Sequence, residues 1–170
     1  VLPLFFVDIT PDMFSQKPNV AIVGSTGAVG QAMVAILEQR EFPVGTLYPL
    51  ASERSAGKTV MFRNKAVSVA LLESFDFSDV EVAFFSAGAS VSAKHAARAV
   101  ASGCVVIDNT SHFRNDPAIP LVVPEVNPSA LSSHSGIIAN PNCSTIQMVV
   151  ALKPIYDAVG ITRINVCTYQ

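Results

Sequence analysis

The chain has 170 residues, half of them hydrophobic, and a formal net charge of −2 with 14% charged residues. This length favours one domain with a full core. No basic run appears, which argues against nucleic acid and anionic membrane surfaces as partners, and no apolar run approaches the roughly 20 residues that cross a bilayer. Three widely spaced cysteines without a CxxC pair argue against a disulfide scaffold or a metal site and favour a reducing, cytoplasmic setting.

The two ends of the chain are unusual. The first residues, VLPLFFVDITPD, are apolar but lack the basic stretch of a signal peptide. Met13 precedes FSQKPNVAIVG, so one interpretation takes Met13 as the native start and residues 1–12 as upstream sequence. The alternative is an ordinary N-terminal strand or arm. The last residues, ITRINVCTYQ, have the pattern of an interrupted strand, so we expect a piece of a longer protein.

Apolar strands alternate with helical patterns between these ends. Helices are predicted at 28–40, 90–101, 127–132 and 145–159, and strands at 19–23, 46–51, 80–85, 104–108, 121–123, 137–139 and 161–169, with a hairpin or short strands within 57–72. Near-continuous apolar strands separated by helices are typical of a parallel sheet that is covered on both faces. We therefore predict an α/β, doubly wound, mostly parallel Rossmann-like domain.

A glycine-rich loop follows the first predicted strand. VAIVGSTGAVGQAM places glycines at 24, 27 and 30 between that strand and an amphipathic helix. Glycines permit a tight turn and let the backbone approach a pyrophosphate at the helix N-terminus. The loop predicts dinucleotide binding by Gly24, Ser25, Thr26, Gly27, Ala28, Val29 and Gly30; a tight turn without a ligand is the alternative.

The end of the second strand distinguishes the two nicotinamide cofactors. An acidic residue there holds the ribose of NAD, whereas arginine accommodates the 2′-phosphate of NADP. The segment ASERSAGK offers two hydroxyls and two basic groups to a phosphate: Ser52, Ser55, Arg54 and Lys58. The acidic Glu53 argues for NAD and would need to point away from the phosphate. This composition favours NADP over NAD, and a solvated loop without a ligand is the alternative.

Cys143 stands where a strand, a polar turn and a helix start coincide, in IIANPNCSTIQMV. The free amides and positive end of a helix N-terminus favour a thiolate, which is the nucleophilic form of cysteine. Asn142 and the first-turn amides offer donors to an oxyanion. A buried, unreactive cysteine is the alternative, and it is the prediction for Cys104 and Cys167. With a nicotinamide cofactor, the thiolate predicts aldehyde addition, hydride transfer and an acyl-thioester that water or phosphate then cleaves.

Five ordered motifs, VAIVGSTGAVG, ASERSAGK, VIDNTSHFR, LVVPEVN and NPNCSTIQM, together resemble aspartate-β-semialdehyde dehydrogenases, and the terminal TYQ is similar to that family's active-site strand. The resemblance covers residues 19–170. It implies that Cys143 forms the acyl-thioester, that Asn142 helps to hold the thiohemiacetal oxygen and that Gln170 orients the substrate. It also implies that Arg114 binds inorganic phosphate, which its planar guanidinium suits; an exposed loop arginine is the alternative.

The resemblance implies three segments: an N-terminal extension at 1–18, an NADP-binding domain at 19–143 and the beginning of a catalytic and dimerisation domain at 144–170. It implies a homodimer that reduces β-aspartyl phosphate to aspartate semialdehyde in lysine, threonine and methionine biosynthesis. The family's general-base histidine falls beyond Gln170. We interpret His95 and His134 as surface residues, and His112 as nearer the site but without a catalytic role.

Two consequences and two alternatives follow. The chain alone is expected to have little turnover, and apolar surface left exposed in it is expected to promote aggregation. One alternative is a related acyl-phosphate reductase with another substrate. The other is a non-catalytic NADP-binding module.

Overall fold

The computed structural model describes residues 17–169. The interpretations of residues 1–12, Met13 and Gln170 lie outside these residues. The elements run in the order β1 (Val20–Val23), α1 (Ala28–Gln39), β2 (Leu47–Ala51), β3 (Thr59–Phe62), β4 (Lys65–Ser68), β5 (Ala70–Leu71), β6 (Val82–Phe85), α2 (Ala89–Ala101), β7 (Val105–Asp108), the 3-10 helix η2 (Pro128–Ser133), β8 (Ile137–Ala139) and α3 (Cys143–Val159).

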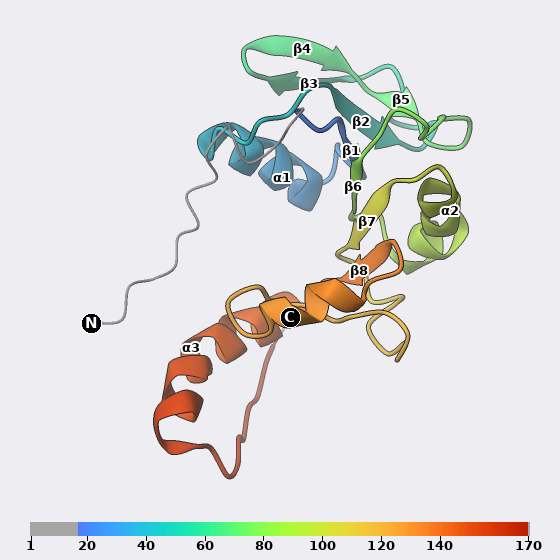
Figure 1. The fold of residues 1–170 in the computed structure, drawn as a ribbon. Helices are drawn as coiled ribbons and strands as arrows, with labels where there is room; N and C mark the ends of the chain where they lie inside the picture. Colours follow the sequence, from blue (N-terminus) through green and yellow to red (C-terminus); the bar gives the residue numbers. More distant parts are fainter. Residues whose placement is uncertain (1–16, 170) are drawn as a thin grey trace.

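Six strands form one sheet in the order β5-β2-β1-β6-β7-β8. Every pair in this sheet is parallel, with Val20 of β1 in register with both Leu47 of β2 and Val82 of β6. The strands after β1 lie on its two opposite sides, which is the strand order of a doubly wound fold (Figure 1). The predicted fold class is confirmed.

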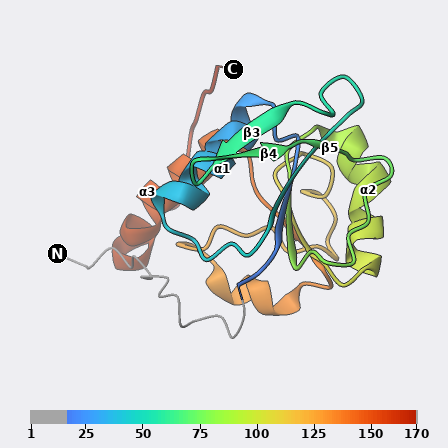
Figure 2. The same cartoon turned by 90° about the horizontal axis from the view of Figure 1, so that it is seen from above.

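Side chains alternate between the two faces of the sheet, and each face has its own helix. Val20 and Ile22 pack against Val34 and Leu37 of α1, whereas Ala21 and Val23 pack in the cluster that contains Ala96 and Ala99 of α2. Figure 2 shows the two helices on opposite sides of the strands. The run VAIV is completely buried because it faces a helix on both sides.

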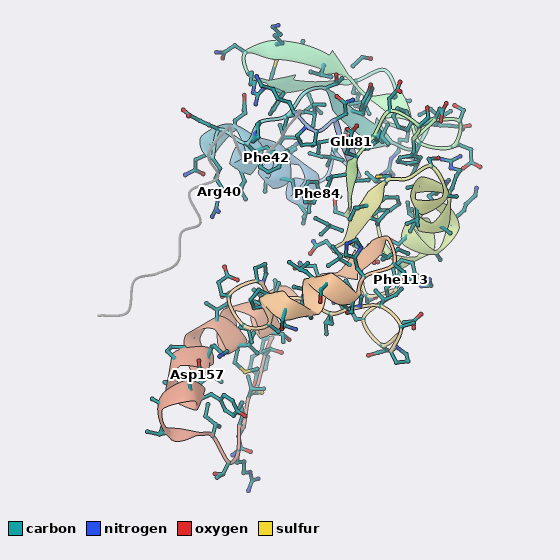
Figure 3. The ribbon with its side chains drawn as sticks, viewed as in Figure 1. Arg40, Phe42, Glu81, Phe84, Phe113 and Asp157 are labelled. Carbon is teal, nitrogen blue, oxygen red and sulfur yellow. The ribbon has the colours of Figure 1, made fainter. Side chains whose placement is uncertain are left out.

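The hairpin β3–β4 lies outside the main sheet, and it is antiparallel. Arg63 and Asn64 form its turn with φ of 50° and 60°, the left-handed geometry that suits a two-residue hairpin. The Arg63 guanidinium donates to the carbonyls of Val44 and Phe42, and its backbone amide donates to Glu38 of α1. These contacts attach the hairpin to the end of α1, where Figure 3 places Phe42.

The short helix predicted at 127–132 is present as the 3-10 helix η2. Two predicted strands were wrong. Residues 121–123 contribute one bridge, between Leu121 and Ala139. Residues 161–169 pair with no strand in the described part of the chain, although their composition suits one, because a strand forms only where a partner strand offers hydrogen bonds.

Helix α3 extends away from the sheet (Figure 1). It contains Pro154 and, unlike α1 and α2, it has no buried residue within the chain that the structure describes. Its ion pair between Lys153 and Asp157 is solvent-accessible, and Figure 3 shows Asp157 on the projecting part of the helix.

Candidate active site

Two loops meet where the strand order reverses, at the carboxyl ends of β1 and β6. Gly24 has φ of +89°, and a Cβ built on it would lie 3.1 Å from the backbone nitrogen of Ala87 in the loop after β6. Only glycine combines this conformation with so close an approach. In an open α/β sheet, this crevice is where ligands bind.

The first turn of α1 offers free backbone amides at this crevice. Gly27 is its N-cap and supplies no side-chain cap, and no acidic residue lies in the first turn. A Cβ on Gly30 would lie 2.3 Å from the carbonyl oxygen of Gly24, so glycine is required there for the loop to fold back. Because the amides are uncapped, the residues present fit a pyrophosphate.

The predicted cofactor residues of this loop divide into two groups. Ser25 is buried, and its hydroxyl donates to the Leu50 carbonyl at 3.3 Å, so it attaches the loop to β2. The part of the loop that is open to solvent comprises residues 26–29. The glycine loop therefore presents mainly backbone to a ligand.

The turn after β2 lies beside the glycine loop because β2 pairs with β1. Ser52, Glu53 and Arg54 are exposed, whereas Ser55 is buried and its amide donates to the Ser52 carbonyl at 2.9 Å. Within the described residues, the Arg54 side chain makes no hydrogen bond or ion pair. A cation and a hydroxyl are thus available next to the glycine loop, with the Glu53 carboxylate close in sequence.

Cys143 is the first residue of α3 and is exposed. Asn142 caps the helix: its Oδ1 accepts from the Ser144 amide at 3.0 Å and from the Ser144 hydroxyl at 2.7 Å, and the Cys143 sulfur lies 3.9 Å from it. The cap uses the Oδ1 atom of Asn142. The Nδ2 atom of the same side chain has no partner within residues 17–169 and is therefore available to donate a hydrogen bond to a ligand. The predicted oxyanion donor is therefore also the helix cap, a role that the sequence reasoning did not assign.

Arg114 is attached to the cysteine loop. Its Nε donates to the carbonyl of Asn140 at 2.9 Å, three residues before Cys143, and one Nη donates to the carbonyl of Asn109 at 3.0 Å. Among the described residues the remaining N–H groups have no partner, so they can bind an anion. Phe113 packs against the α2-side cluster and anchors the same loop (Figure 3).

Two asparagines that the sequence reasoning missed join these loops. Asn109 follows β7, Asn140 follows β8, and the Asn140 amide nitrogen donates to the Asn109 amide oxygen at 2.6 Å. The signal that could have found them is position, because each polar residue comes directly after one of two neighbouring parallel strands. Cys143, Asn142 and Arg114 are brought together in this way, whereas Gln170 lies outside the described residues.

The other cysteines and histidines stand apart from this arrangement. Burial, with a smaller contribution from Glu81, raises the pKa of Cys104 to about 12, so its predicted inertness agrees with the structure. The prediction of a buried Cys167 was wrong, since the residue is exposed on the unpaired segment. His95 was predicted at the surface but is buried on α2, because it faces the sheet side of an alanine-rich helix.

Among residues 17–169, no helix is both long enough and apolar enough to cross a membrane. No group of three or more His, Cys, Asp or Glu residues in the described range is arranged to hold a metal ion.

The fold and site define a dinucleotide-binding domain joined to a loop that presents an exposed cysteine as the first residue of a helix. A family described as semialdehyde dehydrogenase, NAD binding domain, matches residues 19–134, and the chain belongs to this family. Aspartate-semialdehyde dehydrogenase 2 of Vibrio cholerae is 65% identical over 158 residues, which are 92% of this chain and 47% of the relative.

Two solved structures extend the comparison. The crystal structure of aspartate semialdehyde dehydrogenase II complexed with ASA from Vibrio cholerae has 64% identity and a TM-score of 0.84, over 86% of this chain and 48% of that one. The crystal structure of aspartate semialdehyde dehydrogenase with NADP from Candida albicans has 27% identity and a TM-score of 0.71. The match covers 86% of this chain and 48% of that one. The chain thus spans about half the length of the relatives it matches.

Proposed function

We propose that this chain is the part of an NADP-dependent aspartate-semialdehyde dehydrogenase that binds the cofactor and carries the nucleophile. One observation carries the proposal: in a chain 65% identical to such an enzyme, Arg114 is hydrogen-bonded to the loop that presents Cys143. An anion-binding group and a nucleophile at one site suit an acyl phosphate. We extend the proposal to a cytoplasmic homodimer in lysine, threonine and methionine biosynthesis on the family resemblance alone.

In the biosynthetic direction, the Cys143 thiolate attacks the acyl carbon of β-aspartyl phosphate. A carbon–sulfur bond forms, the carbon–oxygen bond to phosphate breaks, and Arg114 holds the departing phosphate, which takes up a proton. NADPH, when bound, supplies the hydride that reduces the resulting thioester. Asn142 Nδ2 donates to the thiohemiacetal oxygen, and cleavage of the carbon–sulfur bond then releases the aldehyde and restores the thiolate.

The cofactor part of the proposal rests on the glycine loop and the turn after β2. The uncapped amides of α1 receive the pyrophosphate, and Arg54 with Ser52 and the Ser55 segment receives the 2′-phosphate. The NADP complex of the Candida albicans relative supports this choice. Glu53 is exposed, so it can point away from the phosphate.

The full-length gene product tests the proposal through NADPH formation from aspartate semialdehyde, with and without inorganic phosphate. We expect phosphate-dependent NADPH formation in the wild type, and a loss on the order of 10³-fold or more in Cys143→Ser because the nucleophile acts in every turnover. Phosphate-independent activity, or full activity of Cys143→Ser, would contradict the proposal.

A non-catalytic NADP-binding module is distinguished by cysteine reactivity. The chain contains its own control, since Cys167 is exposed but does not lie at a helix N-terminus. We expect iodoacetamide at neutral pH to modify Cys143 faster than Cys167, and to leave Cys104 unmodified in the folded chain. Equal rates at Cys143 and Cys167 would favour the binding module.

A further inference from the structure

A buried carboxylate lies at the centre of the site without being part of the mechanism above. Asp108, the last residue of β7, is completely buried. Its Oδ1 accepts from the Ser92 hydroxyl at 2.7 Å and from the Thr110 amide at 3.2 Å, and its Oδ2 accepts from the Thr110 hydroxyl at 2.8 Å. A buried carboxylate is stable only with such partners, so these donors are held firmly in place.

Thr110 transmits this order to the loop that carries Arg114. Its hydroxyl donates to Asp108 and accepts from the backbone amide of His112 at 3.2 Å. The turn of residues 110–112 is thereby fixed two residues before Arg114. A change at Thr110 therefore alters the start of the loop without touching the guanidinium.

The backbone of Asp108 and its neighbour fix the other side of Arg114. The Asp108 carbonyl accepts from the Asn140 amide at 2.8 Å, and Asn109 bonds to Asn140 through their side chains. The carbonyls of Asn109 and Asn140 are the two acceptors of the Arg114 guanidinium. Thus the Asp108 carbonyl and the Asn109 side chain both hold Asn140, whose own carbonyl is one of the two acceptors of Arg114.

Ser92 connects this network to the cofactor side of the sheet. It is the fourth residue of α2 and is completely buried. Helix α2 begins directly after the loop of residues 86–88, which contacts Gly24 of the glycine loop. The network therefore joins the crevice between β1 and β6 to the loop before Cys143.

From this connection we propose that Asp108 is a positioning residue: through Ser92 and Thr110 it holds Arg114 in the orientation that receives the phosphate beside Cys143. The inference rests on the proposed function of the site. It assigns Asp108 no contact with substrate or cofactor. Loss of the network is expected to weaken phosphate binding specifically, because a small displacement of a positioned group can cost up to about 10²-fold.

The test compares Thr110→Val with Thr110→Ser in the full-length protein. Valine removes the hydroxyl that bonds to Asp108 and His112 while keeping a similar shape, and serine retains it. We expect Thr110→Val to raise the KM for phosphate by about tenfold or more, with kcat and the Kd for NADP changed less than about threefold. Thr110→Ser is expected to behave like the wild type.

Equal losses in kcat, in the KM for phosphate and in NADP affinity would show a merely structural role and would overturn the inference, as would an unchanged KM in Thr110→Val. If Thr110→Val does not fold, Ser92→Ala replaces it. This change removes one donor from Asp108 and the 3.2 Å hydrogen bond between the Thr110 and Ser92 hydroxyls, and it keeps the bonds of Thr110 to Asp108 and His112. The same expectation and the same contradiction apply to it.

A second readout separates this inference from the proposed function. Inorganic phosphate is expected to change the rate at which iodoacetamide modifies Cys143 in the wild type and in Thr110→Ser, and not in Thr110→Val. If the wild type shows no phosphate-dependent turnover, the proposed function fails. The effect of phosphate on the modification rate of Cys143 then decides by itself whether Asp108 positions an anion site. The same phosphate effect in all three proteins would overturn the inference.

Discussion

The sheet with α1 and α2 differs sharply from α3 and the segment that follows it. In the sheet, every residue of β1 is fully buried, and the two faces have separate apolar clusters. In the second region, Val159 is 81% exposed and Tyr169 is 93% exposed. Cys143 lies at the boundary, on the first residue of α3. The sheet region has its own core, whereas no residue between 143 and 169 is buried. Under the proposed function, we therefore expect cofactor binding to depend on the first region alone and turnover to depend on more than this region.

The largest effect is therefore expected when turnover and cofactor binding are compared directly. The 170-residue chain should bind NADP with an affinity close to that of the full-length gene product, but its turnover should be at least about 10²-fold lower, because general acid–base catalysis alone contributes roughly 10²–10⁴-fold. Fluorescence titration with NADPH and the phosphate-dependent assay measure the two quantities. Comparable turnover in both proteins would remove the distinction between the two regions.

The next effect concerns the glycine loop. Gly30→Ala should abolish NADP binding and lower stability, because its Cβ would lie 2.3 Å from the Gly24 carbonyl oxygen, a backbone atom that cannot move freely. Gly27→Ala is the matched control, since its Cβ meets only that oxygen, at 3.4 Å. Calorimetric titration and thermal melting test both variants. Equal melting temperatures for the two variants would contradict the steric argument.

The sequence predicted the first region better than the second, for a physical reason. The strand VAIV is buried on both faces, and VVID is buried on one face and partly buried on the other, so their apolar composition indicates a parallel sheet. The segment 161–169 has a similar composition but lacks a partner strand among the described residues, and composition cannot supply one. The Cys143 helix start was predictable from Asn142 and Pro141. The contacts of Arg114 with Asn109 and Asn140 were not predictable, because they join residues 5 and 26 positions apart. The same holds for the contact of Asp108 with Ser92, which is 16 positions away, since only the folded sheet brings these residues together.

Stability offers a third way to sharpen the comparison. Phe77 is 1% exposed, stacks on Phe85 and meets Phe75 edge to face, so Phe77→Ala should cost about 3–5 kcal/mol of unfolding free energy. Ile155→Ala on α3, where the side chain is half exposed, should change it by less than about 0.5 kcal/mol in the 170-residue chain. Urea unfolding measures both. A large loss at Ile155 would show that α3 packs more tightly than its exposure indicates.

The smallest expected effect is a pH dependence of the sheet region. Burial lowers the pKa of His95, and the charges of Arg98 and Lys94 lower it further. Glu73, whose carboxylate lies 3.5 Å from the His95 Nε2, acts in the opposite direction and raises it. A histidine whose pKa is lower in the folded state binds protons more readily when unfolded. The neutral His95 therefore contributes fully to the free energy of unfolding above its unfolded pKa of 6.5. This contribution is lost as the pH falls toward the lower pKa of the folded state.

Glu73 behaves differently, which makes the effect of His95 measurable. The hydrogen bond from Lys94 lowers the pKa of Glu73. The contribution of Glu73 to the free energy of unfolding is therefore present above its unfolded pKa of 4.5 and disappears only below that pH. His95→Gln should consequently flatten the fall in urea midpoint that begins as the pH drops below 6.5. An unaltered slope in His95→Gln would assign the acid sensitivity of the sheet region to groups other than its buried histidine.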